Sequence, residues 1–499
     1  MNAVIAGVGQ ITQRVDPAEA LEPVDLMAEA TRRAEADACA RRSVLPAVEL
    51  VAVVNILSWR HPDPGQVLAG RLRLDGVRTA HTTIGGNSPG LLLNELGGEI
   101  SAGRLRAALV VGAEAVHTQR RAGRPLPWVD TESPGVEEGE PRLFGDARPG
   151  SNRDEAAHHA AVPTQVYPLF ETAWRAAAGR GVEEHQRALS RLWSGFAAVA
   201  AGQPEAWSRT AFEPDDIRLP GPDNRMVTFP YTKRMCANPD VDQAAAVLLC
   251  SEEVARDAGV PDDRIVHLQA GADAHDTHLV SERGSLARSP AIAAATADVL
   301  RAGRLGIDDV ARFDLYSCFP SAVEVAMDAL GLAGPEAGDH RPLTLTGGLA
   351  FFGGPGNNYM THSVAAMVDA CRRDPGSYGL VTGVGWYLTK HSVGLYSTRP
   401  PATGFQRIAP AATQARVEAA PRRRPAGAYA GPATVEATAV RFSREGGPTL
   451  AVVSALTPDG ARALANTSEP ALMTSMTTEE WAGRVVELRT DGQVNTLVV

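Results

Sequence analysis

The sequence predicts an α/β protein with two similar halves, followed by a small β-barrel. Three observations predict this class. Strand-like apolar runs alternate with amphipathic stretches up to residue 395, as they do where helices cover both faces of a sheet. One unit, a Gly-rich turn followed by an apolar helix and a buried strand, occurs twice, beginning at residues 85 and 353. Beyond residue 432, short segments of alternating apolar and polar residues indicate barrel strands.

The first elements follow in chain order. Residues 2–11 form an apolar run that predicts a strand. The Gly-Val-Gly within residues 7–12 resembles part of a dinucleotide-binding fingerprint, but the last glycine is missing, so we interpret it as a turn at a strand end. Residues 25–40 have helical periodicity and residues 50–57 form a continuous apolar run. These patterns predict a helix and then a buried strand.

The duplicated unit is the strongest signal in the chain. Its first copy begins with Gly-Gly-Asn-Ser-Pro-Gly and its second with Gly-Gly-Pro-Gly-Asn-Asn. The turn, helix and strand are expected at 85–90, 91–100 and 105–112, and then at 353–358, 359–371 and 379–385. A duplicated α/β domain produces this pattern, and so do two chance matches among Gly-rich loops.

The remaining segments complete the domain organisation. A long segment between the two copies of the unit includes a Pro-rich, charged stretch at 130–146 and two helix-like stretches at 164–178 and 183–200. We interpret this segment as an inserted loop domain. Barrel strands are expected at 433–442, 449–456, 462–466 and 484–499. We therefore expect a first half at 1–265 with the loop domain inserted at about 118–235, a second half at 266–395, a linker at 396–432 and a barrel at 433–499.

The composition excludes several classes of protein. The 499-residue chain has 44% hydrophobic and 21% charged residues, which is ordinary for a globular protein, and its net charge of -10 argues against nucleic acid or an anionic membrane as the main partner. The N-terminal residues lack the basic region of a signal peptide, and no apolar stretch approaches the ~20 residues of a membrane span. The five cysteines are scattered, without zinc-site spacing. We expect a reduced, cytoplasmic protein without a bound metal.

Four short motifs carry a resemblance to a known family. They are Asn-Ser-Pro-Gly at 87–90, Tyr-Ser-Cys-Phe at 316–319, Gly-Gly-Pro at 353–355, which follows Gly-Gly-Leu at 347–349, and Gly-Val-Gly at 383–385. In their order they resemble the four catalytic loops of the thiolase superfamily, and most closely its sterol-carrier-protein-thiolase-like branch. The C-terminal region resembles the additional domain of thiolase-like proteins of type 1, often named acetyl-CoA acetyltransferases. The resemblance implies a duplicated thiolase fold, with two βαβαβαββ halves in five αβαβα layers, an inserted loop domain and an OB-like barrel.

The residues that thiolases use for chemistry are replaced in all four motifs. Asn87 and Gly383 stand where the resemblance implies two cysteines, and a register shift of one residue would put Thr382 in the second position. Gly354 stands in place of the histidine, and Tyr316 in place of an asparagine or histidine. An amide cannot act as a thiolate nucleophile, and loss of one oxyanion-hole donor alone typically lowers the rate ~10²–10³-fold. We therefore expect ordinary thiolysis and Claisen condensation to be absent.

The resemblance implies CoA or acyl-CoA as the ligand and no tightly bound cofactor. The function that we expect first is action on a CoA thioester without a covalent acyl-enzyme, by aldol-type chemistry with Tyr316 as acid/base. This role requires a lowered pKa of the phenol. The alternatives are a non-catalytic acyl-CoA-binding or scaffold protein, an acyltransferase of unusual mechanism, and a structural member of a multi-enzyme complex. An enzyme of acyl-CoA metabolism is a possible partner, and both a monomer and a homodimer are compatible with the sequence.

The motifs also supply candidate site residues. The catalytic candidates are Tyr316, Asn87, Ser317 and Tyr359. The candidates for substrate or CoA contact are Asn87, Ser88, Gly353, Gly354, Asn358, His362 and Gly385. Structural alternatives stay open: Tyr316 packs in the core, Ser88 caps the first central helix, Asn357 and Asn358 cap the second, and His362 is a structural histidine.

For three further groups of polar residues we expect neither a catalytic role nor metal binding. His158 and His159 are expected on a surface helix. The group Asp273, His275, Asp276 and His278 is expected on a solvated loop rather than at a metal. The basic run Arg120, Arg121 and Arg124 either lies in a solvated segment or contacts the phosphates of CoA.

Overall fold

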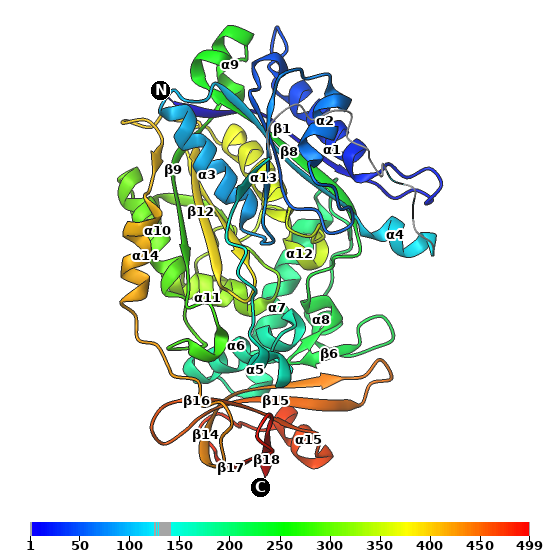
Figure 1. Cartoon of the computed structure of the whole chain (residues 1–499), viewed down its shortest axis with the longest axis vertical. Helices are drawn as coiled ribbons and strands as arrows, with labels where there is room; N and C mark the ends of the chain where they lie inside the picture. Colours follow the sequence, from blue (N-terminus) through cyan, green and yellow to red (C-terminus); the bar gives the residue numbers. More distant parts are fainter. Residues whose placement is uncertain (1, 124–125, 127, 129–140, 499) are drawn as a thin grey trace.

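A computed structural model describes residues 2–123, 126, 128 and 141–498 of the chain. The molecule is elongated, with a large α/β core at one end, a helical layer in the middle and a β-barrel at the other end (Figure 1). No helix in the described part of the chain is long and apolar enough to cross a membrane.

The first half is built on a mixed sheet. Its strands are β1 (Ala3–Thr12), β2 (Leu50–Val53), β3 (Arg78–Thr82), β4 (Ala107–Ala115) and β8 (Asp242–Ser251), with β5 (Arg142–Phe144) added beside β3. Strand β2 runs parallel to β4, whereas β4 pairs antiparallel with β8, and β8 pairs antiparallel with β1. The expected strand near the N-terminus is confirmed as β1.

The second half repeats this pairing pattern. Its strands are β9 (Val266–His275), β10 (Val310–Asp314), β11 (Tyr378–Gly385) and β12 (Lys390–Ser397). Strand β10 is parallel to β11, and the pairs β11–β12 and β12–β9 are antiparallel. The same succession of pairings in both halves confirms the duplication. The two sheets join where β1 pairs with β9, with Val4 opposite His267.

Two central helices lie between the sheets. They are α3 (Ser88–Ser101) and α13 (Tyr359–Arg373), which contact each other and strands of both halves. Their close approach depends on Gly90, because a Cβ atom there would lie 2.5 Å from the Cε atom of Met360. Helix α1 (Pro23–Asp37) covers the outer face of the first sheet and α10 (Pro290–Gly303) that of the second. This gives the five expected αβαβα layers.

The loop domain forms the middle layer. Its helices include α5 (Arg153–Ala157), α6 (Pro163–Ala177), α7 (Val182–Ala201) and α8 (Pro214–Arg218), followed by the hairpin β6 (Met226–Phe229) and β7 (Tyr231–Thr232). The two helices expected from periodicity are confirmed as α6 and α7. Strand β6 pairs with β14 of the barrel, so this domain also extends the C-terminal sheet. Part of the expected charged segment at 130–146 lies outside the described residues.

A closed five-stranded barrel forms the C-terminal end. Its strands are β14 (Gly431–Phe442), β15 (Pro448–Leu456), β16 (Arg462–Thr467), β17 (Val485–Thr490) and β18 (Asn495–Val498). The pairings run β14–β15–β16–β18–β17 and return to β14. Helix α15 (Pro470–Thr478) was not expected, and the single strand expected at 484–499 is the hairpin β17–β18. The turn of this hairpin includes Asp491-Gly492, a dipeptide typical of tight turns.

The segment 396–432 differs from the linker that its composition predicts. It contains β13 (Gln406–Arg407), which pairs with β9, and helix α14 (Pro410–Glu418), which packs against α10 and β9. Thr413 and Val417 are buried in that contact. Only two residues of α14 are buried, so the helix has a weak apolar pattern that sequence periodicity does not reveal.

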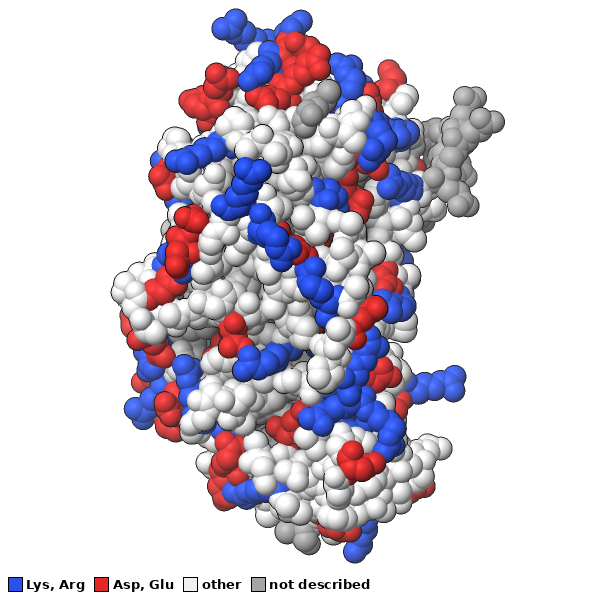
Figure 2. Space-filling view, turned by 90° about the vertical axis from the view of Figure 1, so that its left-hand side faces the viewer, with Lys and Arg blue, Asp and Glu red and all other residues white. Residues whose placement is uncertain are grey.

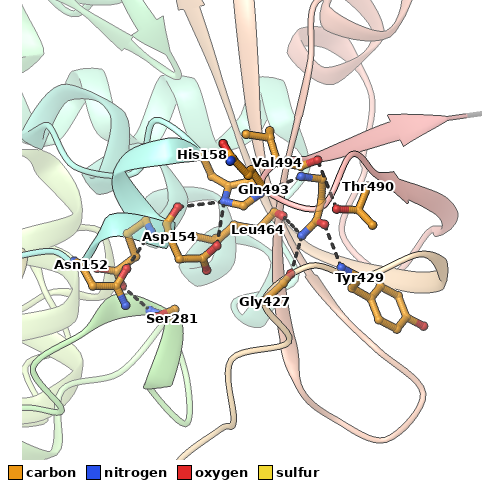
Figure 3. Close-up of polar contacts among 12 residues, drawn as sticks. Asn152, Asp154, His158, Ser281, Gly427, Tyr429, Leu464, Thr490, Gln493 and Val494 are labelled. Atoms are coloured by element: carbon orange, nitrogen blue, oxygen red, sulfur yellow. Dashed lines mark hydrogen bonds and ion pairs between the residues drawn. The ribbon is translucent and has the colours of Figure 1, made fainter.

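The barrel docks on the loop domain through a buried histidine (Figure 3). His158 at the end of α5 is fully buried; its Nε2 accepts a hydrogen bond of 2.9 Å from the backbone N–H of Asn495, and its Nδ1 donates one of 2.8 Å to the carbonyl of Asp154. Asn466 donates to the carbonyl of His158 at 3.0 Å. The surface position expected for His158 is therefore wrong, because the fold uses its ring as a link between domains, whereas His159 is exposed as expected.

The net negative charge does not produce a uniformly acidic surface. On the side of the molecule that includes α10 and α14, acidic and basic side chains alternate, and a line of Lys and Arg residues descends toward the barrel (Figure 2). Charges of both signs on one face leave local basic regions available for an anionic ligand.

Candidate functional site

The four motifs converge where α3 begins and β11 ends. A Cβ atom on Gly383 would lie 2.9 Å from the Cα atom of Asn87, and one on Gly385 would lie 2.5 Å from the Asn87 Oδ1. The first and fourth motifs touch because both positions lack side chains. A side chain at position 383 would collide with Met360 and with the backbone of the first motif, so the packing here requires glycine.

Tyr316 of the second motif lies directly over the first motif. A Cβ atom on Gly86 would lie 2.0 Å from the Tyr316 hydroxyl oxygen, so this phenol fills the space above the start of α3. The second and third motifs meet where the Ser317 Oγ accepts a hydrogen bond of 3.3 Å from the Leu349 N–H. The motifs are therefore brought together as the resemblance implies, and the phenol of Tyr316 occupies the space above the first motif.

Asn87 is buried in the position of the expected cysteine. Its Nδ2 donates a hydrogen bond of 3.4 Å to the Ser392 Oγ, and its Oδ1 is buried without a hydrogen-bond partner among the described residues. Ser88 lies inside the first turn of α3, and its Oγ donates to the Thr83 carbonyl at 3.1 Å. The expected Ser88 cap is wrong, because the helix begins one residue earlier than the Ser-Pro pair predicts.

Tyr316 is a neutral phenol. Its ring makes an edge contact with Tyr359, with centroids 5.5 Å apart, and its backbone N–H donates to the Thr382 Oγ1 at 2.9 Å. Burial raises the pKa of Tyr316 well above its ordinary value, with further contributions from Cys318 and Tyr359. The lowered pKa that an acid/base role requires is not found, but a neutral phenol can still donate a hydrogen bond or a proton.

Tyr359 serves the packing of the third motif. It is fully buried, and its hydroxyl lies 2.5 Å from the Thr346 Oγ1 and 3.5 Å from the Asp314 Oδ1. Burial and the Asp314 carboxyl raise the pKa of Tyr359. Its hydroxyl is thus engaged in a buried network, and nothing in its surroundings exposes it to a ligand.

The candidate asparagines tie the two halves together. Asn358 donates to the Gly112 carbonyl at 2.7 Å, and Asn357 accepts from the Gly85 N–H at 2.8 Å and donates to the Asn55 carbonyl at 3.0 Å. Neither forms the expected cap of α13, since its N-cap residue Asn358 makes no side-chain capping bond. The side-chain amides of both residues therefore form hydrogen bonds with backbone groups of the first half, and these bonds connect the two duplicated units.

The other binding candidates are also packed into the fold. The His362 Nδ1 donates to the Gln10 Oε1 at 2.8 Å, and burial lowers the pKa of His362 to about 3, so it is a neutral core histidine. Gly353 has a φ of 116°, and a Cβ atom there would lie 2.4 Å from the Gln243 Oε1. Gly354 donates its N–H to the Asn238 carbonyl at 2.8 Å.

The cysteines do not supply a substitute nucleophile. Burial raises the pKa of Cys236, Cys250 and Cys318 to about 12, and that of Cys371 to about 11. The thiolate is the reactive form of cysteine, and it is scarce at neutral pH when the pKa is this high. Cys39 is exposed at the end of α1, on the outer face of the first sheet.

A basic pocket opens beside the second and third motifs, and sequence reasoning found only one of its cations. This cavity of about 910 Å³ lies where the loop domain meets the core. Its charged lining residues are Arg120, Arg225, Lys233, Arg234 and Arg444, against Asp223 and Asp240. Its aromatic lining residues are Trp207, Phe212 and Phe351. We refer to this cavity as the basic pocket.

The floor of the basic pocket is hydrogen-bonded to the motifs. The lining residue Ala237 donates its N–H to the Cys318 carbonyl at 2.9 Å, and the lining residue Asn238 accepts from Gly354. Cys236 also lines the pocket, but its Sγ lies 3.4 Å from the Thr232 carbonyl oxygen, toward which it donates. A ligand in the pocket would therefore reach the edge of the second and third motifs.

The charges of the pocket are only partly neutralised. Arg120 lies 3.6 Å from Asp240, and the Arg234 guanidinium stacks over the Phe212 ring at 4.2 Å. Arg225, Lys233 and Arg444 form no ion pair with any residue in the described part of the chain. Of the other two residues in the basic run that includes Arg120, Arg121 pairs with Asp16 at 3.3 Å and Arg124 lies outside the described residues.

The cluster around His275 is not a ligand set. Asp273 and Asp276 are buried rather than on a solvated loop, because Asp273 pairs with Arg407 at 2.8 Å and Asp276 with His391 at 3.1 Å. Burial lowers the pKa of His275 to about 4. The two carboxylates serve the packing of the second half, so the expectation of a solvated loop is wrong for them.

The overall fold is similar to those of several solved structures. The crystal structure of a monomeric SCP2-thiolase-like protein type 1 from Mycobacterium smegmatis is 31% identical, with a TM-score of 0.84, and the match covers 100% of this chain and 99% of that one. The Ltp2-ChsH2(DUF35) aldolase is 17% identical, with a TM-score of 0.60, over 80% of this chain and 98% of its own. The Acat5 thiolase from Ascaris suum in complex with coenzyme A is 14% identical, with a TM-score of 0.55, over 80% and 100%. No curated protein matches the chain.

The C-terminal end gives an independent comparison. Residues 413–493 match the family described as the thiolase-like protein type 1 additional C-terminal domain. This stretch includes most of α14, the strands β14 to β17 and helix α15. The similarity to the Mycobacterium smegmatis protein extends over the duplicated core and this domain together. The chain therefore belongs to the SCP2-thiolase-like protein type 1 family.

Proposed function

We propose that the protein binds CoA or a CoA thioester in the basic pocket and does not form a covalent acyl-enzyme. The observation that carries the proposal is the lining of the pocket. Three cations without an ion-pair partner in the described chain, Arg225, Lys233 and Arg444, face a cavity that also has three aromatic side chains. Phosphate groups favour Arg and Lys, and an adenine ring favours aromatic faces and stacked guanidinium groups. CoA has both features.

The position of the pocket supports a thioester at its inner end. Ala237 and Asn238, which line it, are hydrogen-bonded to Cys318 and Gly354 of the second and third motifs. The thiolase fold neighbour from Ascaris suum was solved in complex with coenzyme A, which agrees with a CoA ligand for this fold. The raised pKa values of Cys236, Cys250, Cys318 and Cys371 argue for binding without acyl transfer to these thiols.

Isothermal titration calorimetry with CoA and acetyl-CoA tests this proposal. We expect binding, and we expect the double variant R225A/K233A to bind at least about tenfold more weakly, because hydrogen bonds to charged groups contribute about 1.5–3 kcal/mol. The variant R32A is the matched control, since Arg32 is an exposed arginine on α1 whose only described ion pair is with Glu29 at 3.6 Å. Equal affinity in all three proteins, or no binding at all, would remove the proposal.

A second function, aldol-type chemistry on the bound thioester, is favoured by the position of Tyr316. Its neutral phenol lies against Gly86 at the junction of the motifs, where it could donate a proton to a developing alkoxide. A fold neighbour is an aldolase that includes a DUF35 component, which agrees with this chemistry on this fold. Tyr316→Phe keeps the ring and removes the donor. Under this proposal the variant binds CoA normally but loses about 10²–10⁴-fold in lyase turnover; unchanged turnover would exclude the role.

A further inference from the structure

Three buried ionisable side chains meet where the loop domain contacts the second half. Glu171 lies on α6, His185 on α7 and Glu324 on α11 (Pro320–Leu330). All three are buried, and one potential ligand atom from each lies within 4.8 Å of the others. Glu171 and His185 lie in the loop domain, Glu324 lies five residues after the second motif, and none of the three lines the basic pocket.

The hydrogen bonds around the cluster use only some of its atoms. The His185 Nε2 lies 2.6 Å from the Glu171 Oε1 and 3.9 Å from the Glu324 Oε2. The other oxygen of Glu171 accepts a hydrogen bond of 2.6 Å from the Tyr231 hydroxyl. The other oxygen of Glu324, Oε1, lies 3.8 Å from Arg180. Each carboxylate therefore directs one oxygen toward His185 and holds the other on an outer partner.

Two polar atoms of the cluster have no partner outside it. The Glu324 Oε2 and the His185 Nδ1 are buried, and neither forms a hydrogen bond with a described residue outside the cluster. A buried polar atom without a partner is destabilising, and more so if the group is charged. Two carboxyl groups this close, in a buried site, need either a shared proton or a cation.

We infer that Glu171, His185 and Glu324 form a binding site for a divalent transition-metal ion of the Zn²⁺ type. One imidazole and two carboxylates are ligands that Zn²⁺ accepts, and three protein ligands leave a fourth position open. A 2+ ion neutralises the two carboxylates. It would also give the Glu324 Oε2, which points toward His185, the partner that it lacks.

Outer contacts already orient two of the three ligands. Tyr231 holds Glu171 and Arg180 holds Glu324, in the manner of the second layer of contacts that fixes carboxylate ligands at metal sites. Arg180 is itself paired with Glu336 at 3.8 Å and lies over the Trp174 ring at 5.3 Å. Glu324 also lines a cavity of about 640 Å³ between α7 and α11, which gives an ion a path to the site.

Metal binding to the full-length protein tests the inference. Protein treated with a chelator is dialysed against Zn²⁺, and bound metal is counted by mass spectrometry of the elements. We expect one Zn²⁺ per chain at this site. Because loss of a contact that only orients a ligand costs 10–100-fold in metal affinity, loss of the ligand itself in Glu324→Gln should weaken binding by at least about 100-fold. Glu183→Gln, a change of an exposed glutamate on α7 that contacts neither the cluster nor its outer partners, is the matched control and should bind like the wild type.

The choice of Glu324→Gln separates a lost ligand from a damaged fold. Glutamine has the shape of a protonated glutamic acid, so the metal-free variant should melt at the temperature of the metal-free wild type. Zn²⁺ should then raise the melting temperature of the wild type and not that of the variant. A wild-type protein that binds no stoichiometric Zn²⁺ overturns the inference, as does Glu324→Gln with wild-type affinity. If the variant does not fold, crystals of the wild type grown with Zn²⁺ decide it, through the presence or absence of anomalous density between the three side chains.

Discussion

The neutral state of His362 makes a prediction about stability in acid. The histidine is fully buried between α13 and β1, and its pKa is lowered from an ordinary 6.5 to about 3. In the unfolded chain the same imidazole takes up a proton near its ordinary pKa. Between these two values the unfolded state binds more protons than the folded state, so stability falls as the pH falls.

The size of this effect follows from the two pKa values. At pH 7, His362 is mostly unprotonated in both the folded and the unfolded state, so its low pKa in the folded protein changes the free energy of unfolding little. At pH 5 the unfolded imidazole is almost fully protonated and the folded one is not, which removes about 2 kcal/mol of stability relative to pH 7. His362→Asn removes this proton linkage, while the Asn Nδ2 retains a donor for Gln10. Any cavity that the variant creates costs the same at both pH values and cancels in the comparison.

The assay is chemical denaturation followed by tryptophan fluorescence at pH 7 and pH 5. We expect the loss of unfolding free energy between the two pH values to be about 2 kcal/mol smaller in His362→Asn than in the wild type. His159→Asn, a change of an exposed histidine, is the control and should lose as much as the wild type. The same loss in His362→Asn as in the wild type would refute a neutral, buried His362.

Three further predictions concern the motifs and the barrel. Gly383→Cys should lower stability by about 1–3 kcal/mol without restoring thiolysis of acetoacetyl-CoA, because its side chain meets the backbone of the first motif; a folded variant of wild-type stability would contradict this. His158→Ala should cost about 2–4 kcal/mol, since it removes two hydrogen bonds and leaves the Asn495 N–H buried and unpaired; hydrogen exchange at Asn495 should accelerate, and unchanged protection would show that the docking contact is unimportant. Incubation with acetyl-CoA should leave the intact mass of the protein unchanged, whereas a stable acetyl adduct on a cysteine would support the acyltransferase alternative.

Much of the core could be predicted because it is local in sequence. Each duplicated unit joins a Gly-rich turn, an apolar helix and a buried strand within about thirty residues, so its pattern is visible without the fold. The convergence of the four motifs followed from the resemblance. Its geometric reason, the contacts that require glycine at 86 and 383, became visible only in three dimensions.

The parts that escaped prediction depend on distant segments. Strand β6 pairs with β14, with Phe229 opposite Val440, and no local pattern signals such a pairing. The buried His158 and the basic pocket are similar cases, because their partners come from several segments of the chain. Helix α14 was missed for a different reason: it buries few residues, and its composition of Pro, Ala and Arg is typical of a linker.

A crystal structure with CoA bound tests the central claim most directly. The account predicts CoA in the basic pocket, with its phosphates beside Arg225 and Lys233, its adenine against the aromatic side chains and its thiol end near Gly354, with no covalent bond to the protein. A ligand bound elsewhere on the chain, or its acyl group attached to a cysteine, would contradict the account.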